Sequence, residues 1–262
     1  MNTTIPRNWW KPEYGFFGQH YIQGDNSVHG YRPHRDQSLT ERTKEEVDGI
    51  IHLCDIQSKM GKVHIYDLPC GYGRHSLELA KRGYKVTGLD INEIHLAEAE
   101  KLNVESRVTF LRHNMLDLLP SESTNVCINM FYSFGFFETD EENEQVLKNI
   151  YNGLRVGGMF LMHTDVNIPF VENGSYQFNE TRNLSNNEKL IVTESYDPIR
   201  KRINGSWTIS NVTKEYSVRV YSEQEFRDLC VKVGFKETFS YSGWKKEPYS
   251  PDSDLMIITA RK

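Results

Sequence analysis

The stretch from Val63 to His75 constrains the fold of this chain more than any other. Apolar, β-prone residues lead up to Asp67, a Gly-x-Gly turn follows at Gly71 and Gly73, and a helical pattern of leucine and alanine starts directly afterwards. Glycine lets the backbone bend tightly and lets a ligand approach without a Cβ in the way, and the new helix offers unpaired N–H groups in its first turn. The sequence therefore predicts a strand, a cofactor-binding turn and a helix.

A second strand points to a nucleotide cofactor. It runs from Lys85 to Leu89 and ends on Asp90, 23 residues after Asp67. An acidic side chain at that position can accept hydrogen bonds from both hydroxyls of a ribose. Strand and helix patterns then alternate as far as a strand over 159–163, which predicts a parallel sheet with helices on both faces.

Composition and charge narrow the class of partner. The chain has 262 residues, enough for one sizeable α/β core with additions, and a net charge of −5. A weakly acidic chain has no overall attraction for a phosphate backbone, so no nucleic-acid partner is expected. The first residues show no signal-peptide pattern and no apolar run could span a bilayer, which predicts a soluble, cytoplasmic protein without a membrane partner. The four cysteines have no metal-ligand spacing, so we expect reduced, buried thiols and no metal site.

Changes of pattern along the chain predict four segments. Residues 1–38 are rich in aromatics and glycine and are interpreted as a lid over the cofactor cleft, with simple cover of a sheet edge as the alternative. Residues 39–174 form the Rossmann-like cofactor-binding core. In 175–221 short strands follow one another, which predicts an antiparallel insertion that covers the substrate. Residues 222–262 return to the core sheet with a helix and two strands.

Several motifs resemble a known family. Asp67-Leu-Pro-Cys-Gly-Tyr-Gly-Arg-His75 resembles the glycine-rich motif of class I S-adenosylmethionine-dependent methyltransferases, and residues 133–143, 154–161 and 249–262 are similar to small bacterial members. The resemblance implies an α/β fold: a Rossmann-like seven-stranded methyltransferase sheet, mostly parallel with the last strand antiparallel, helices on both faces and an antiparallel β insertion. The chain departs from many members at Pro69, which removes one backbone donor from the loop.

The resemblance implies S-adenosyl-L-methionine as the cofactor, with S-adenosyl-L-homocysteine as the product, and assigns residues to its amino-acid end. Asp67 and the backbone around Gly71 and Gly73 should meet the ammonium and carboxylate groups. Arg74 is interpreted as facing the cofactor carboxylate or a protein acid. The backbone carbonyl near Phe131 should face the ammonium.

The adenosine end is assigned in the same way. Asp90 should bind the ribose hydroxyls, and Ile91 should lie against the adenine face. Asn114 resembles the residue that pairs with the adenine amino group, with the backbone N–H of Met115 beside it. The alternative for Asn114 is a turn residue at a strand end, but its place one strand further along the same sheet edge favours the ligand.

Catalysis would be an in-line displacement, in which the protein mainly aligns nucleophile, methyl and sulfur and excludes water. A hydroxyl acceptor needs a general base, and an amine must arrive deprotonated. His163 ends a strand at the site edge and titrates near neutrality, so it is a candidate base, with a strand-capping role as the alternative. Tyr21 is a second candidate, whose phenol could point at the methyl group; packing is the alternative.

Four further residues are candidates for contact with the acceptor: Tyr14, Tyr132, Asp165 and Trp207. The insertion that contains Trp207 is similar to the substrate cover of small-molecule N- and O-methyltransferases. Residues 129–132 occupy the place where methyltransferases of nucleic-acid amino groups carry two prolines, and both prolines are absent here. The acceptor is therefore predicted to be a small molecule.

The sequence thus indicates methyl transfer to a nitrogen or oxygen of a small metabolite or natural-product intermediate. Two alternatives stay open. The chain could bind the cofactor as a non-catalytic sensor or partner subunit, because the residues assign no base firmly. It could also be a nicotinamide-dependent oxidoreductase, since a glycine turn with an acid about 20 residues later is also the dinucleotide signature, although the third glycine is absent. The oligomeric state is not predicted.

Overall fold

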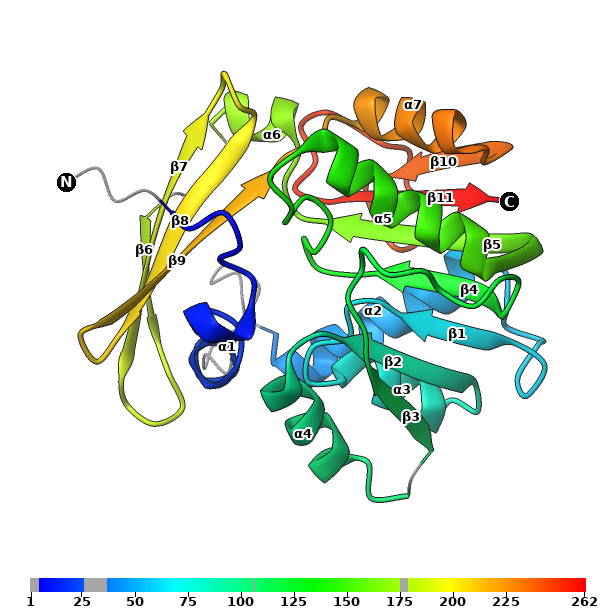
Figure 1. The fold of residues 1–262 in the computed structure, drawn as a ribbon, viewed down its shortest axis with the longest axis horizontal. Coiled ribbons are helices and arrows are strands. Elements are labelled where there is room, and N and C mark those ends of the chain that lie inside the picture. The colour runs from blue at the N-terminus through cyan, green and yellow to red at the C-terminus, as the bar shows by residue number, and fades with distance from the viewer. Residues whose placement is uncertain (1–4, 26–36, 106, 175–178) are drawn as a thin grey trace.

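The computed structural model describes residues 5–25, 37–105, 107–174 and 179–262. It contains two sheets, with most helices around the larger one (Figure 1). The larger sheet consists of seven strands: β1 (His64–Asp67), β2 (Lys85–Asp90), β3 (Val108–Arg112), β4 (Thr124–Asn129), β5 (Leu154–Thr164), β10 (Glu237–Tyr241) and β11 (Met256–Arg261). The smaller sheet consists of four: β6 (Asn179–Asn183), β7 (Lys189–Asp197), β8 (Arg202–Ile209) and β9 (Val212–Arg219).

Strand order confirms the predicted fold class. The larger sheet has the order β10-β11-β5-β4-β1-β2-β3. Its strands pair in parallel, except that β11 runs antiparallel to both of its neighbours, β5 and β10. The smaller sheet is antiparallel throughout. The order reverses between β1 and β4, and in open α/β sheets ligands bind outside the carboxyl ends of the strands at such a point.

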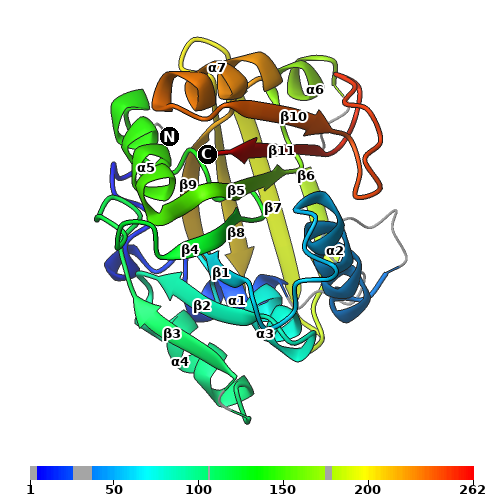
Figure 2. The ribbon, with the colours of Figure 1, turned by 90° about the vertical axis from the view of Figure 1, so that its right-hand side faces the viewer.

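Helices cover both faces of the larger sheet. Figure 2 shows α2 (Leu39–Leu53) and α3 (Arg74–Lys81) on one side, and α5 (Asp140–Gly153) and α7 (Glu223–Val233) on the other. α4 (Glu93–Leu102) packs along β2 and β3.

Sequence signals at the helix starts explain where these helices begin. α7 begins with a capping box at Ser222, and α5 has another at Thr139. The cap of α2 is Ser38, whose hydroxyl accepts from the Glu41 N–H while the Glu41 side chain accepts from the Ser38 N–H.

The amino-terminal segment contains a short helix, α1 (Gln19–Asp25), after a 3-10 turn over Pro12–Tyr14. Figure 1 shows α1 between the smaller sheet and the carboxyl ends of the larger one. It contacts both α4 and β8, so it bridges the two sheets. Of the predicted lid, 1–4 and 26–36 lie outside the described residues, as do 175–178 of the first predicted strand of the insertion. A further short helix, α6 (Ile168–Glu172), precedes the smaller sheet.

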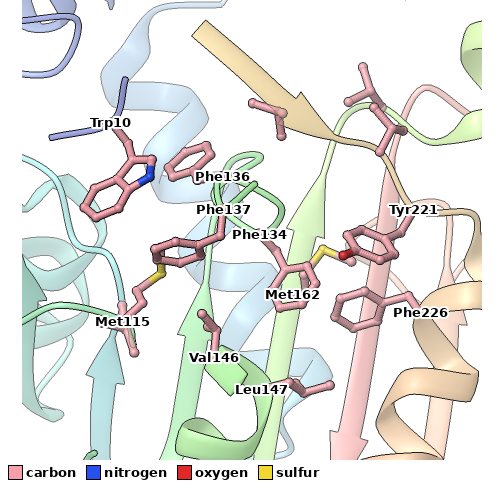
Figure 3. Packing of buried hydrophobic residues seen from close by; sticks show 14 of the residues in the cluster. Trp10, Met115, Phe134, Phe136, Phe137, Val146, Leu147, Met162, Tyr221 and Phe226 are labelled. Carbon is pink, nitrogen blue, oxygen red and sulfur yellow. The ribbon is translucent and has the colours of Figure 1, made fainter. Parts of the chain in front are cut away.

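One hydrophobic core continues from the larger sheet into the smaller one. Figure 3 shows part of it, with Trp10 and Phe137 at one end and Tyr221 and Phe226 at the other. At the junction, the Arg219 N–H donates to the Gly135 carbonyl over 2.9 Å. Gly135 has a φ of +105°, and a Cβ there would overlap the Arg219 carbonyl. Because nothing larger than glycine fits, the loop after β4 meets β9 of the smaller sheet backbone to backbone.

Candidate active site

A cavity lies at the carboxyl ends of β1, β2 and β4, where the strand order reverses. Its empty volume is about 840 Å³, part of which is open to solvent. Seven of the nine residues predicted to bind the cofactor line it: Gly71, Arg74, Asp90, Ile91, Asn114, Met115 and Phe131. Asp67 and Gly73 are not among its lining residues. The structure therefore gathers most of the predicted cofactor residues in one place.

Asp90 is held rigidly at the edge of this cavity. Its Oδ2 accepts from the Gly71 N–H and its Oδ1 from the Asn92 N–H, each over 2.8 Å. Each carboxylate oxygen has a second lone pair, so both can still accept from hydroxyl groups. The pKa of Asp90 is raised by burial, against which nearby His95 and the backbone donors act to lower it. This arrangement fits the predicted contact with two ribose hydroxyls.

The two glycines of the turn have different roles. Both have positive φ, +54° at Gly71 and +82° at Gly73. A Cβ on Gly73 would lie 2.8 Å from the Phe110 ring and 2.9 Å from the Ala99 Cβ, so this glycine allows close packing of the corner. At Gly71 the nearest atom to such a Cβ is 3.9 Å away, because the residue faces the cavity. Gly71 therefore lines the cavity, whereas contact of the Gly73 backbone with the cofactor remains a prediction.

Asp67 lies behind the turn and is fully buried. The Ser76 hydroxyl donates to its Oδ2 over 2.6 Å, and its Oδ1 has no hydrogen-bond partner among the described residues. Burial raises the pKa of Asp67 to about 7, although the Ser76 hydrogen bond and the charge of Arg74 act in the opposite direction. Direct contact of Asp67 with the cofactor remains a prediction. Its buried position behind the turn favours an indirect role, in which Asp67 supports the turn that lines the cavity.

A buried cluster of charges anchors Arg74 beside the cavity. Glu46 of α2 pairs with Arg74, with Arg42 at 3.6 Å and with the His75 Nε2 at 2.9 Å. Burial acts to raise the pKa of Glu46, but Arg74 and the His75 hydrogen bond hold it well below its usual range. Arg74 thus faces a protein acid, Glu46, which was one of its two predicted partners. Its Nη2 is buried without a partner among the described residues, so it can also donate to a cofactor carboxylate.

Residues of the amino-terminal segment also line the cavity: Trp10, Phe17, Tyr21 and Asp25. Asp25 accepts from the Tyr72 hydroxyl over 2.5 Å, and the Gly18 N–H donates to the His95 Nε2 over 2.9 Å. Sequence reasoning named Tyr21 but missed Asp25 and His95. The available signal was that His95 lies in the first turn of α4, directly after the strand that ends on Asp90, and that a glycine-rich aromatic segment can reach it.

A second cavity, which we call the aromatic compartment, adjoins the first and has an empty volume of about 450 Å³. Its lining residues come from the amino-terminal segment, the loop after β4 and the smaller sheet: Trp9, Phe16, Phe17, Tyr21, Phe131, Tyr132, Ser133, Phe136, Trp207, Tyr216 and Val218. Five of them line the cofactor cavity as well: Phe17, Tyr21, Phe131, Ser133 and Phe136. The two spaces therefore share a wall.

The predicted acceptor contacts divide between this compartment and other places. Tyr132 and Trp207 line it, and Tyr21 lines both cavities. Tyr14 is 42% exposed and lines neither of them. Asp165 is buried and also lines neither.

His163 supports the loop after β4 and does not line either cavity. Its Nδ1 accepts from the Phe131 N–H and its carbonyl from the Tyr132 N–H, both over 3.2 Å. Phe131 and Tyr132 have φ values of +60° and +65°, which are costly for residues other than glycine. The ring stacks on Trp244 at 5.1 Å, and burial lowers the His163 pKa to about 4. Because the only free lone pair of the neutral ring is used by Phe131, this placement argues against the base role and for the structural alternative.

Fold and site together define a class of protein: a Rossmann-like α/β domain that binds a nucleotide cofactor at the switch point of its sheet, with a second cavity beside it. Comparison with known proteins adds a family match over part of the chain. Residues 65–158 match the family described as the methyltransferase domain. The chain shares the fold of class I S-adenosylmethionine-dependent methyltransferases, with the same kind of mostly parallel seven-stranded sheet.

Two curated relatives carry methyltransferase names. A Geobacillus protein (strain WCH70) named as a methyltransferase is 33% identical over 106 residues, which are 39% of this chain and 42% of that relative. The chain thus spans less than half the length of this relative. The cypemycin N-terminal methyltransferase of a Streptomyces species is 22% identical over 205 residues, which cover 76% of this chain and 82% of the relative.

Solved structures share the fold. The CcbJ methyltransferase of Streptomyces caelestis superposes with a TM-score of 0.70 at 16% identity, over 83% of this chain and 89% of that one. The S-adenosylmethionine-bound amino pentose methyltransferase CalS10 of Micromonospora echinaspora has a TM-score of 0.61 at 16% identity, over 87% and 93% of the two chains. The cofactor of the family is S-adenosylmethionine, and the donors found here fit it: a fixed carboxylate for a ribose and a buried guanidinium for a carboxylate.

No helix in the described part of the chain is long and apolar enough to cross a membrane. Within the same residues no group of three or more histidine, cysteine, aspartate or glutamate side chains is arranged to hold a metal ion.

Proposed function

We propose that this protein transfers the methyl group of S-adenosylmethionine to a nitrogen or oxygen atom of a small molecule. The observation that carries the proposal is the wall shared by the two cavities. A cofactor whose ribose is held at Asp90 and whose amino-acid end is near Arg74 would lie along the loop after β4, which also bounds the aromatic compartment. An acceptor in that compartment would then reach the cofactor without crossing bulk water.

The chain's own residues would bind, orient and enclose the reactants. Asp90 fixes one end of the cofactor, and the guanidinium of Arg74, held by Glu46, binds the other. When bound, the cofactor supplies an activated methyl group on a sulfonium. Phe17, Tyr21 and Phe136 stand between the two cavities and exclude water from the line of transfer. The distribution of work follows the general rule that the cofactor carries the chemistry and the protein aligns the partners.

Relatives support a small acceptor, since one structural neighbour is described as an amino pentose methyltransferase. Another relative is described as an N-terminal methyltransferase of cypemycin, so the relatives do not agree on one acceptor. The sequence predictions of a cytoplasmic location and of no nucleic-acid partner remain predictions.

Equilibrium binding tests the proposal against both alternatives. In a calorimetric titration, S-adenosylhomocysteine should bind and NADH should not. Labelled S-adenosylmethionine should then transfer its methyl group to members of a panel of small amines and hydroxy compounds. Binding of NADH without S-adenosylhomocysteine would contradict the proposal, and tight cofactor binding with no transfer to any member of the panel would favour a sensor.

A further inference from the structure

The lining of the aromatic compartment selects a kind of acceptor. Nine of its eleven lining residues are aromatic, and the other two are Ser133 and Val218. Tyr21 and Trp207 lie parallel, with ring centroids 5.3 Å apart and 5° between the planes. Trp9 meets the Phe136 ring edge-on at 5.2 Å. Flat walls of this kind bury a flat, apolar body best, because aromatic pairs stack or meet edge to face.

Side chains that carry a charge at neutral pH are absent from the described residues that line the compartment. None of these residues is an aspartate, glutamate, histidine, lysine or arginine. The Ser133 hydroxyl donates to the Met130 carbonyl, and the Tyr216 hydroxyl to Glu194. Tyr21 stays a neutral phenol, since burial raises its pKa far above its usual range. The lining thus offers no base for a hydroxyl proton and no counter-ion for an acidic acceptor.

From this combination, and resting on the methyl transfer proposed above, we infer that the acceptor is a flat aromatic compound that presents an uncharged nitrogen lone pair. The lone pair forms the N–C bond as the C–S bond breaks, and the electrons of that bond return to sulfur. The positive charge moves from sulfur to the nitrogen, so the displacement itself requires no proton transfer. Aromatic faces attract a cation, so the rings around the compartment stabilise this charge as it arrives on the acceptor.

Three probes distinguish this inference from its competitors: isoquinoline, 2-naphthol and cyclohexylamine. The first two are bicyclic aromatics, one with a ring nitrogen and the other with a hydroxyl group. The third is an alkylamine that has no flat ring and is protonated at mildly alkaline pH. Each is titrated calorimetrically into the full chain saturated with S-adenosylhomocysteine, at a mildly alkaline pH where isoquinoline is unprotonated. Isoquinoline should bind at least about tenfold more tightly than cyclohexylamine. With labelled S-adenosylmethionine, methyl transfer to isoquinoline should exceed transfer to 2-naphthol.

Failure of the inference can be told from failure of the proposed function. If S-adenosylhomocysteine binds but neither aromatic probe binds its complex, the inference is wrong and the cofactor assignment stands. Preferred methylation of 2-naphthol would contradict the inference that the acceptor atom is nitrogen. Tighter binding of cyclohexylamine than of isoquinoline would contradict the inference that the acceptor is flat. If S-adenosylhomocysteine itself does not bind, the proposed function fails first.

A filled compartment gives a second readout. Val218→Trp places a large ring in the aromatic compartment alone, because Val218 lines that compartment and not the cofactor cavity. The affinity for isoquinoline should fall by about tenfold or more while S-adenosylhomocysteine still binds. Val212→Trp is the matched control, because Val212 is on the same strand and 51% exposed. Should Val218→Trp misfold, Phe16→Leu removes a ring from the compartment only. Unchanged isoquinoline affinity in a folded variant of either kind would contradict the inference.

Discussion

The cofactor cavity and the aromatic compartment share a wall but are built in opposite ways. The polar part of the cofactor cavity comes largely from one continuous stretch, 69–95, and relies on backbone N–H groups, fixed carboxylates and a guanidinium. The aromatic compartment is assembled from three stretches far apart in the chain, 9–21, 131–136 and 207–218, and is almost wholly aromatic.

This difference separates two kinds of recognition. A bound nucleotide is recognised by charges and donors whose positions follow from one turn, so a short motif encodes it. An apolar acceptor is recognised by surfaces that exist only once distant segments have packed together. Substitutions should therefore act on one cavity and spare the other, and the following predictions test that separation, from the largest expected effect to the smallest.

Asp67→Asn should stabilise the free protein at alkaline pH. The folded-state pKa of about 7 lies above the ordinary value of 3.8, so the stability of the wild type falls as the pH rises from about 4 through 7. The variant is not subject to this loss, and its free energy of unfolding should exceed that of the wild type above pH 7 by up to roughly 4 kcal/mol. Urea unfolding across this pH range measures the difference. An advantage that grows towards acid pH would show that the carboxyl is not the buried group described here.

Gly135→Ala should loosen the junction between the loop after β4 and β9. Its Cβ would overlap the Arg219 carbonyl at a positive φ, which should lower the free energy of unfolding by about 3 kcal/mol. Gly157→Ala is the control, since that glycine also has a positive φ of +76° but open space around it, and it should cost only about 1 kcal/mol. Equal losses in the two variants, measured by denaturant unfolding, would mean that the junction is not tightly packed.

Asp90→Ala should affect the cofactor alone. Loss of two charge-assisted hydrogen bonds to the ribose should weaken S-adenosylhomocysteine binding by about 2 kcal/mol in a calorimetric titration. Glu93→Ala is the control, because Glu93 lies three residues after Asp90 and its side chain is exposed. This variant should bind S-adenosylhomocysteine as tightly as the wild type does. An unaltered affinity in Asp90→Ala would refute the ribose assignment.

His163 variants should separate a positioning role from a base. Asparagine can keep an acceptor near the position of Nδ1, whereas alanine leaves the Phe131 N–H without one. His163→Ala should therefore unfold more easily than His163→Asn by about 1 kcal/mol, and His163→Asn should retain most of the methyl transfer. If the rate of methyl transfer fell equally in both variants, by about 100-fold or more, the result would show that His163 is the base.

The sequence predicted the cofactor half of the molecule better than the acceptor half. Asp90 and Asn114 follow strands whose carboxyl ends meet at one edge, so their convergence is a property of the fold. The helix over Gln19–Asp25 was not predicted, because a short segment flanked by glycine becomes helical through its contacts with α4 and β8. Gly157 and Gly158 have the pattern of a helix end but lie inside β5, where the Gly157 N–H donates to the Lys262 carbonyl and the Gly158 carbonyl accepts from the Lys262 N–H.

Side-chain roles beyond the turn were harder to predict for a physical reason. The position of His163 at the end of β5 is correct, but which way its ring faces depends on Trp244, more than 80 residues later. Asp165 is buried for the same kind of reason, since tertiary packing decides which strand-end groups reach a cavity. Sequence patterns indicate an edge of a sheet, while the cavity is defined only by the packed structure.

The separation of the two cavities is tested most directly by the affinity for S-adenosylhomocysteine in three proteins: the wild type, Asp90→Ala and Val218→Trp. The account predicts that the dissociation constant rises about 30-fold in Asp90→Ala and stays within about twofold of the wild type in Val218→Trp. Equal weakening in both variants, or no change in Asp90→Ala, would contradict it.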